Sequence, residues 1–130
     1  MSQYLDGYAS ETLHGRSVPF ATGLKMANPE MTVIAYGGDG DGYGIGLGHL
    51  LHAARRNVDM LYIVADNENY ALTTGQASPT TPEHIKTRST PEGNLVRPFD
   101  PIKLVDAAGC GFNRTIVDKD IKGLTEAIKE

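Results

Sequence analysis

The sequence predicts one α/β domain in three layers, with helices on both faces of a parallel sheet. Segments of helical spacing alternate along the chain with short apolar runs that favour β-structure. The run at 31–36 is unbroken by charge, which suits a strand covered on both faces. It leads into a glycine cluster at 37–48. A strand that ends in such a loop and is followed by a helix is how α/β folds bind phosphate groups.

The first half of the chain predicts two helices and two strands. Residues 1–15 are polar and contain glycine, so we expect a loop there. A helix is expected over 16–28, because Pro19 lies in its first turn, where a missing N–H costs nothing. Asn28 and Pro29 end this helix. The strand at 31–36, a helix over 44–56 and a second strand over 59–65 follow.

The second half predicts a long loop and three further elements. Residues 66–98 show no clear periodicity. Structureless loops of that length are uncommon inside a compact domain and are usually functional. The remaining elements are a helix over 100–109 with Asp100 as N-cap and Pro101 at its first position, a strand over 114–117, and a final helix to Glu130 that Asp118 or Asp120 caps.

Composition places the chain among ordinary globular proteins. Its 130 residues suffice for one domain with a core, and 40% of them are hydrophobic. The net charge of −4 argues against a nucleic-acid surface, and no apolar run approaches the length of a membrane span. The N-terminus lacks the basic and apolar regions of a signal peptide. The single cysteine, Cys110, excludes an internal disulfide and fits a cytoplasmic protein.

Two carboxylates, Asp39 and Asp41, lie within the glycine cluster. They would repel a bare phosphate, so they fit better if a divalent cation lies between them and the phosphate. Asp39 follows the first predicted strand, and Asn67 follows the second. Because the ends of consecutive parallel strands fall on one edge of a sheet, one side chain from each can reach the same ion. Mg²⁺, which prefers six oxygen ligands, is the expected ion.

Gly38-Asp39-Gly40, followed one helix and one strand later by Asp66-Asn67, resembles the signature of thiamine diphosphate (TPP) enzymes. Several longer motifs resemble the β subunit of the 2-oxoacid:ferredoxin oxidoreductases, the pyruvate synthase group, and the resemblance covers nearly the whole chain. The motifs that carry it are LHGR at 13–16, KMANP at 25–29, GGDGDG at 37–42, HAARRN at 52–57, DNENYALTTGQ at 66–76 and SPTT at 78–81.

This resemblance implies a three-layer α/β/α domain over residues 1–130 that binds the diphosphate half of TPP. Asp39 and Asn67 would bind Mg²⁺ through their side chains, and Asn69 would bind it through its backbone carbonyl. His14 would lie beside the cofactor and take part in catalysis. The other cofactor-binding residues that the resemblance implies are Gly38, Gly40, Asp41, Tyr70, Leu72, Thr73, Thr74 and Gly75.

Simpler interpretations of these residues stay open. Asp39 alone could be a turn aspartate that bonds its own backbone, and residues 73–76 could be an ordinary turn. His14 could be structural. Asp41 could support the metal ligands from behind or face solvent, and we favour solvent. In some relatives a lysine at the position of Thr74 would pair with a distal carboxylate, so threonine there favours small 2-oxo acids such as pyruvate.

The resemblance also implies a reaction, which is oxidative decarboxylation of pyruvate or a similar 2-oxo acid to acyl-coenzyme A, with electrons passing to ferredoxin. The glutamate that activates the cofactor comes from a pyrimidine-binding domain on the α subunit. We therefore expect a partner chain or a homo-oligomer, and an inactive isolated chain. The family's iron–sulfur cluster lacks its cysteine ligands here, so we expect a version truncated at both ends. The alternatives are a non-oxidative TPP-dependent 2-oxo acid decarboxylase and an inert cofactor-binding fragment.

Overall fold

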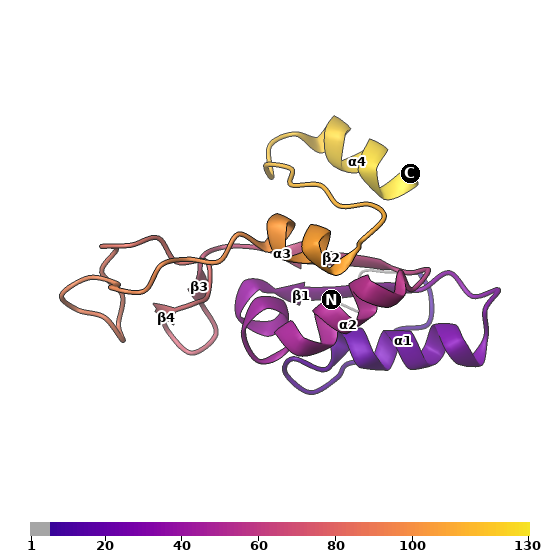
Figure 1. Cartoon of the computed structure of the whole chain (residues 1–130), viewed down its shortest axis with the longest axis horizontal. Helices are drawn as coiled ribbons and strands as arrows, with labels where there is room; N and C mark the ends of the chain where they lie inside the picture. Colours follow the sequence, from indigo (N-terminus) through magenta and orange to yellow (C-terminus); the bar gives the residue numbers. More distant parts are fainter. Residues whose placement is uncertain (1–5) are drawn as a thin grey trace.

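The computed structural model describes residues 6–130 (Figure 1). In the first half, helices and strands alternate as α1 (Ser17–Ala27), β1 (Ile34–Gly38), α2 (Leu47–Arg56) and β2 (Leu61–Ala65), with a π-helical turn, η2 (Gly40–Ile45), between β1 and α2. The second half contains a short hairpin, β3 (Asn69–Tyr70) and β4 (Gln76–Ala77), then α3 (Pro101–Ala108) and α4 (Ile121–Lys129). The predicted α/β architecture with a parallel sheet is confirmed.

β1 and β2 form the parallel pair on which the rest of the first half is built. α2 connects the two strands, as parallel pairing requires a crossover. The register ends with Gly38 opposite Ala65. The residues that follow this last pair are Asp39 and Asp66. The register therefore brings two carboxylates side by side at the carboxyl edge of the sheet.

One face of the strand pair is covered by α1. Burial alternates along β1, as expected when only one face of a strand is packed. Ala21 of α1 forms a buried cluster with Val33 and Ala35, against which Met60 and Tyr62 pack. α1 also contacts α2, and α2 contacts α3. Figure 1 shows α1 and α2 along one side of the strands and α4 projecting away from them.

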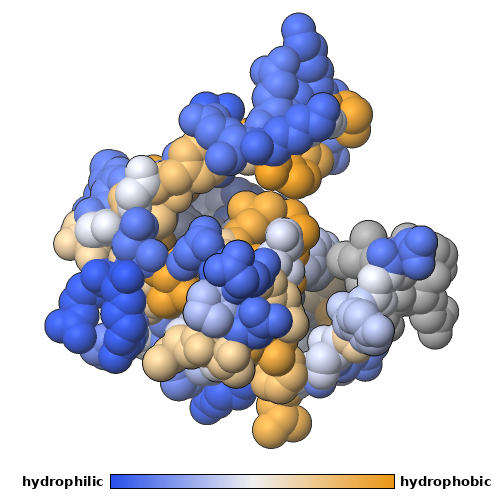
Figure 2. Space-filling model, turned by 90° about the vertical axis from the view of Figure 1, so that its right-hand side faces the viewer, coloured by the Kyte–Doolittle hydropathy of each residue, from blue (hydrophilic) through white to orange (hydrophobic). Residues whose placement is uncertain are grey.

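The opposite face of β1 is largely open. Ile34 and Tyr36 are 58% and 46% exposed. Ile34, Leu61 and Ile128 of α4 line a cavity of about 190 Å³, and Figure 2 shows hydrophobic residues both on the projecting part at the top and on the body below it. The chain exposes 9223 Å², whereas about 6,700 Å² is expected for a compact protein of its mass. The chain therefore carries apolar surface that a compact domain would bury.

The predicted helix caps and helices agree well with the structure. Asp100 accepts a hydrogen bond from the backbone N–H of Lys103, and Asp120 accepts one from Gly123, so Asp120 caps the last helix. The predicted loop over 66–98 contains the β3–β4 hairpin. Among residues 6–130, no helix combines the length and the apolarity that crossing a membrane requires.

Two predictions differ from the structure, because one expected strand is absent and one expected helix is interrupted. The segment 114–117 is not a strand, because no strand among the described residues lies beside it and a lone strand has no partner for its backbone. Arg114 instead forms an ion pair with Glu130, the residue after α4, at 3.2 Å. The predicted helix over 44–56 is broken. Residues 40–45 form η2, and α2 begins only at Leu47, because the glycines tolerate an irregular backbone at this turn.

The glycine turn is held by the ring of Tyr70. Its hydroxyl donates a hydrogen bond to the carbonyl oxygen of Gly40 at 3.3 Å. A Cβ atom on Gly40 would collide with Cε1 of this ring, so any side chain there would displace the ring from η2. Gly48 in α2 differs, because nothing lies within 4 Å of its Cβ position.

We predict opposite effects of alanine at these two glycines. Gly40→Ala should destabilise the chain by about 1–3 kcal/mol through overpacking against Tyr70. Gly48→Ala, the matched control, should stabilise it by up to about 1 kcal/mol, because alanine favours helix. Urea unfolding followed by circular dichroism measures both. Equal effects of the two variants would contradict the packing of Tyr70 on Gly40.

Candidate functional site

Asp39 and Asp66 meet at the hydroxyl of Thr80. Thr80 Oγ1 lies 3.1 Å from Asp39 Oδ2 and 2.7 Å from Asp66 Oδ1. Asp39 is only 2% exposed. Thr80 itself is buried and lies within 3.3 Å of the Ser78 hydroxyl. The end of β1, the end of β2 and the long loop therefore converge on one small cluster of oxygens.

This cluster is short of positive charge. One hydroxyl has one proton, so Thr80 donates to only one of the two carboxylates that it touches. Within residues 6–130, no lysine, arginine or histidine forms an ion pair with Asp39 or Asp66. A buried carboxylate without a compensating charge is costly. Hard oxygen donors that lack a cation are the donor set that Mg²⁺ prefers, so the residues fit the expected ion.

Asn67 and Asn69 lie just beyond Asp66, at the start of the hairpin. The side chain of Asn67 is exposed, and its Oδ1 accepts a hydrogen bond from the N–H of Asn69 at 3.2 Å. The carbonyl oxygen of Asn69 accepts from the N–H of Ala71 at 3.0 Å. The residue that the structure brings next to Asp39 is thus Asp66, while both proposed asparagine ligands make local hydrogen bonds.

The other predicted cofactor residues of this loop form the β3–β4 turn. The carbonyl oxygen of Tyr70 accepts from the N–H of Gly75 at 3.0 Å, which closes the turn. Thr74 and Gly75 have left-handed backbones, with φ of 77° and 108°. Glycine tolerates this conformation and threonine does not favour it, so the shape at Thr74 is strained. Leu72 is 98% exposed at the tip, and Thr73 is also exposed.

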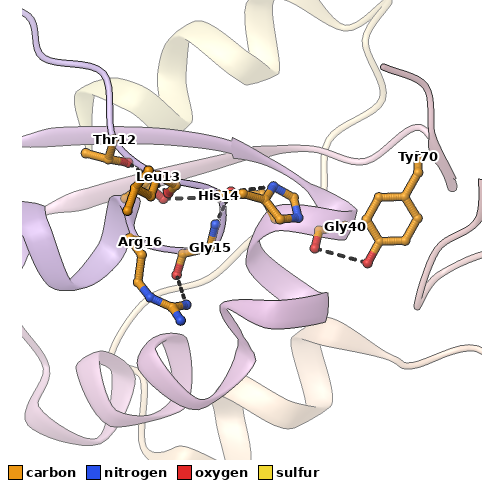
Figure 3. Close-up of polar contacts among 9 residues, drawn as sticks. Thr12, Leu13, His14, Gly15, Arg16, Gly40 and Tyr70 are labelled. Carbon is orange, nitrogen blue, oxygen red and sulfur yellow. Dashed lines mark hydrogen bonds and ion pairs between the residues drawn. The ribbon is translucent and has the colours of Figure 1, made fainter. Parts of the chain in front are cut away.

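Asp41 of the glycine loop binds the segment that carries His14. Asp41 Oδ1 lies 3.3 Å from His14 Nδ1 and accepts a hydrogen bond from the N–H of Gly15 at 2.6 Å, and Oδ2 accepts one from Ser17 Oγ at 3.2 Å. The Asp41 side chain is only 18% exposed, so the expectation that it faces solvent is wrong. Figure 3 shows His14 on the side of the 12–16 turn that faces Gly40 and Tyr70, and the His14 and Tyr70 rings lie 6.3 Å apart.

The pKa values of three tyrosines around the carboxylates are raised above the usual value. Burial raises the pKa of Tyr43 to about 12, and the charges of Asp66 and Asp39 add to this. Burial raises the pKa of Tyr62 to about 12, with the charge of Asp41 adding to it. The pKa of Tyr70 is raised by burial and by Asp39. Burial is the main cause of all three shifts, and the negative charges of the neighbouring aspartates add to it.

Comparison with known proteins assigns the chain to a family. All of residues 1–130 match the thiamine pyrophosphate enzyme, C-terminal TPP binding domain family. The chain belongs to this family. One relative is the 2-oxoglutarate synthase subunit KorB of Archaeoglobus fulgidus, which is 49% identical over 112 residues, covering 86% of this chain and 42% of the relative.

Two further relatives agree with this assignment. The 2-oxoacid:ferredoxin oxidoreductase subunit beta of Saccharolobus solfataricus is 49% identical over 119 residues, covering 92% of this chain and 39% of the relative. The solved 2-oxoglutarate:ferredoxin oxidoreductase from Magnetococcus marinus, with 2-oxoglutarate, coenzyme A and succinyl-CoA bound, superposes with a TM-score of 0.80 at 43% identity. That match covers 83% of this chain and 37% of the other. The chain spans about two fifths of the length of the relatives it matches.

The sequence did not identify all residues of this TPP-binding domain's site. Thr80, Asp66 and Ser17 had no assigned part, although the Thr80 hydroxyl lies between Asp39 and Asp66 and Ser17 donates a hydrogen bond to Asp41. The position of Asp66 could have been found, because β1 and β2 end at paired residues, Gly38 and Ala65, so that the residues after them lie side by side. Thr80 could not have been found, because it is 41 residues from Asp39 in the sequence and only the folding of the long loop brings the two together.

We predict that the stability of the domain falls as the pH rises from about 10 to about 12. Unfolded tyrosines ionise near pH 10, whereas Tyr43 and Tyr62 stay protonated in the folded domain up to about pH 12, so ionisation first favours the unfolded state. Tyr62→Phe should reduce this fall. Its stability at neutral pH should be unchanged or higher, because the Tyr62 hydroxyl is buried with no partner among the described residues. Urea unfolding at both pH values measures this, and a full alkaline fall in Tyr62→Phe would contradict it.

A second prediction concerns the contacts that position His14. Asp41→Ala should cost at least about 1.5 kcal/mol of stability and speed hydrogen exchange at the Gly15 amide, because a charged acceptor is lost in a partly buried place. Asp41→Asn should be intermediate. Asp59→Ala is the control, because the Asp59 side chain is 90% exposed, so solvent screens its pair with Lys25 and the pair is worth about 0–1 kcal/mol. Unchanged exchange at Gly15 in Asp41→Ala would show that Asp41 does not hold the turn.

Proposed function

We propose that this chain is the TPP- and Mg²⁺-binding core of the β subunit of a 2-oxoacid:ferredoxin oxidoreductase. The observation that carries the proposal is the buried Asp39, which follows β1 and lies close to Asp66. Among the described residues, no lysine, arginine or histidine forms an ion pair with it. The family match over the full chain and the names of the related β subunits support it. The single cysteine and the lack of a spanning helix in residues 6–130 are compatible with a cytoplasmic reaction.

In this proposal Asp39 is the central metal ligand. The side chain of Asn67 and the carbonyl oxygen of Asn69 complete the protein's share, while the diphosphate and water supply the other oxygens. For this, Asn67 Oδ1 exchanges its hydrogen bond with the N–H of Asn69 for the ion. The Thr80 hydroxyl, which lies within hydrogen-bond distance of both Asp39 and Asp66, positions the Asp39 carboxylate.

The glycine loop would take the diphosphate. Gly38 leaves room for a close approach of backbone to ligand, whereas the Tyr70 ring packs on Gly40 and fixes the turn. The β3–β4 turn from Tyr70 to Gly75 flanks the same edge. When bound, TPP supplies an electron sink for cleavage of the bond between the carbonyl and carboxyl carbons of a 2-oxo acid. His14, which faces the loop, is the residue of this chain that we place beside the reacting carbon, where Asp41 orients it.

The substrate proposal is a 2-oxo acid, and two observations point to different members of that class. Thr74 offers no cation of its own, which favours a small acid such as pyruvate. The names of two relatives refer to 2-oxoglutarate, and the solved relative holds 2-oxoglutarate and coenzyme A. Coenzyme A is therefore the proposed acyl acceptor, and ferredoxin is the proposed electron acceptor.

Partners are required by this function. A pyrimidine-binding domain on an α subunit must supply the glutamate that activates the cofactor, because none in the described site does so. The 9223 Å² of exposed surface and the open face of β1 provide apolar area for such a partner or for a homo-oligomer. An iron–sulfur cluster needs thiolates from outside these residues, since Cys110 alone does not hold one.

Thermal unfolding tests the cofactor site directly. At concentrations a hundred times Kd, Mg²⁺ and TPP together should stabilise the chain by about 2.7 kcal/mol, while TPP without Mg²⁺ should have little effect. Asp39→Asn should abolish the combined shift, and Asp118→Asn, an exposed aspartate outside the site, should keep it. If no ligand shifts the midpoint in the wild type, the inert-fragment alternative replaces the proposal.

A further inference from the structure

A separate cavity opens beside the proposed cofactor loop. It has a volume of about 430 Å³ and lies between two segments, 67–75 on one side and 81–88 on the other. The first segment carries Asn67 and Asn69, the proposed metal ligands. The second carries two cations, Lys86 and Arg88. A molecule held by the metal and diphosphate can therefore extend toward positive charge.

Arg88 is fixed against the turn that closes the cofactor loop. Its backbone N–H donates to the carbonyl oxygen of Gly75 at 2.7 Å, and its guanidinium donates to the hydroxyl of Thr74. The next residue, Ser89, accepts a hydrogen bond from the N–H of Ala77 at 3.0 Å. The segment around Arg88 is thus attached to the β3–β4 hairpin, which places the exposed Arg88 side chain beside Thr74.

The charge of Arg88 has no anionic partner within the described residues. Neither Arg88 nor Lys86 takes part in an ion pair there. Glu68 is the single acidic residue that lines the cavity, so the lining has a net charge of +1. A guanidinium has five N–H donors, and the contact with Thr74 uses only one Nη group. The remaining donors suit a carboxylate, which arginine binds in a two-point fork.

The proposed reaction removes only one carboxylate of its substrate. The carboxyl group next to the carbonyl leaves as carbon dioxide, and a dicarboxylic 2-oxo acid keeps its second carboxylate throughout. That group must be held by positive charge if it enters a closed site. Thr74 alone offers none, but the guanidinium that contacts its hydroxyl does.

On the basis of the proposed function, we propose that Arg88, with Lys86 beside it, binds the distal carboxylate and makes this chain specific for dicarboxylic 2-oxo acids. The residue at position 74 then acts as a spacer. It is small and neutral, and it orients a cation supplied by the neighbouring loop. Inference from Thr74 alone pointed to small substrates because Arg88 is 14 residues away in the sequence.

The test uses the chain assembled with its partner subunit and loaded with TPP and Mg²⁺. Initial rates of methyl viologen reduction with coenzyme A are measured for 2-oxoglutarate and for 2-oxobutyrate, which lacks the second carboxylate. Arg88→Gln should lower kcat/KM for 2-oxoglutarate about 10- to 100-fold, mainly through KM, and leave 2-oxobutyrate nearly unchanged. Arg88→Lys should recover part of the loss. Arg97→Gln, an exposed arginine outside the cavity, should change neither rate.

Line broadening of the proton NMR signals of 2-oxoglutarate and pyruvate provides a readout that needs no turnover. Broadening of 2-oxoglutarate that Arg88→Gln removes would support the assignment even in an inactive assembly. Equal losses for both acids, or no loss, would overturn it. The thermal shift caused by TPP and Mg²⁺ separates the two proposals. If Arg88→Gln abolishes this shift, Arg88 binds the diphosphate instead of the carboxylate, and if the wild type shows no shift, the proposed function itself fails.

Discussion

The structure depends on one costly arrangement, the burial of the Asp39 carboxylate at the end of β1. Burying a charge without a counter-charge is unfavourable, and the described residues offer Asp39 only the hydroxyl of Thr80, which Asp66 shares. Such a site is stable when a cation completes it. The parallel register, the glycine turn and the folded-back long loop all bring oxygens to this one place, and no other role among the described contacts accounts for that convergence.

Neighbouring features support this edge of the sheet. Tyr70 fills the space beside Gly40 and joins the hairpin to η2, so the turn after β1 and the loop after β2 have fixed positions relative to each other. Asp41 uses both of its oxygens to hold the segment that carries His14. The two aspartates of the glycine loop thus have separate tasks, because Asp39 points into the cluster with Thr80 and Asp41 points toward the N-terminal turn.

The sequence predicted the parts of this fold that depend on local chemistry. The helices near 17–27, 101–108 and 121–129, the aspartate caps of the last two, and the alternation that makes the sheet parallel could all be inferred from spacing and turn residues. The strand over 114–117 could not be judged locally, because a strand needs a neighbour and the sequence does not show whether one is present. Contacts such as Thr80 with Asp39, or Arg88 with Thr74, arise between distant segments and depend on how the long loop folds.

The measurement that tests the central role of Asp39 most directly is pulsed electron–nuclear double resonance with Mn²⁺ in place of Mg²⁺. With TPP present, the manganese spin should couple to phosphorus nuclei of the diphosphate at one ion per chain. This coupling should disappear in Asp39→Ala and persist in Asp41→Ala. Phosphorus coupling that survives in a folded Asp39→Ala variant, or manganese that binds the chain without contacting the diphosphate, would contradict a cation site built on Asp39.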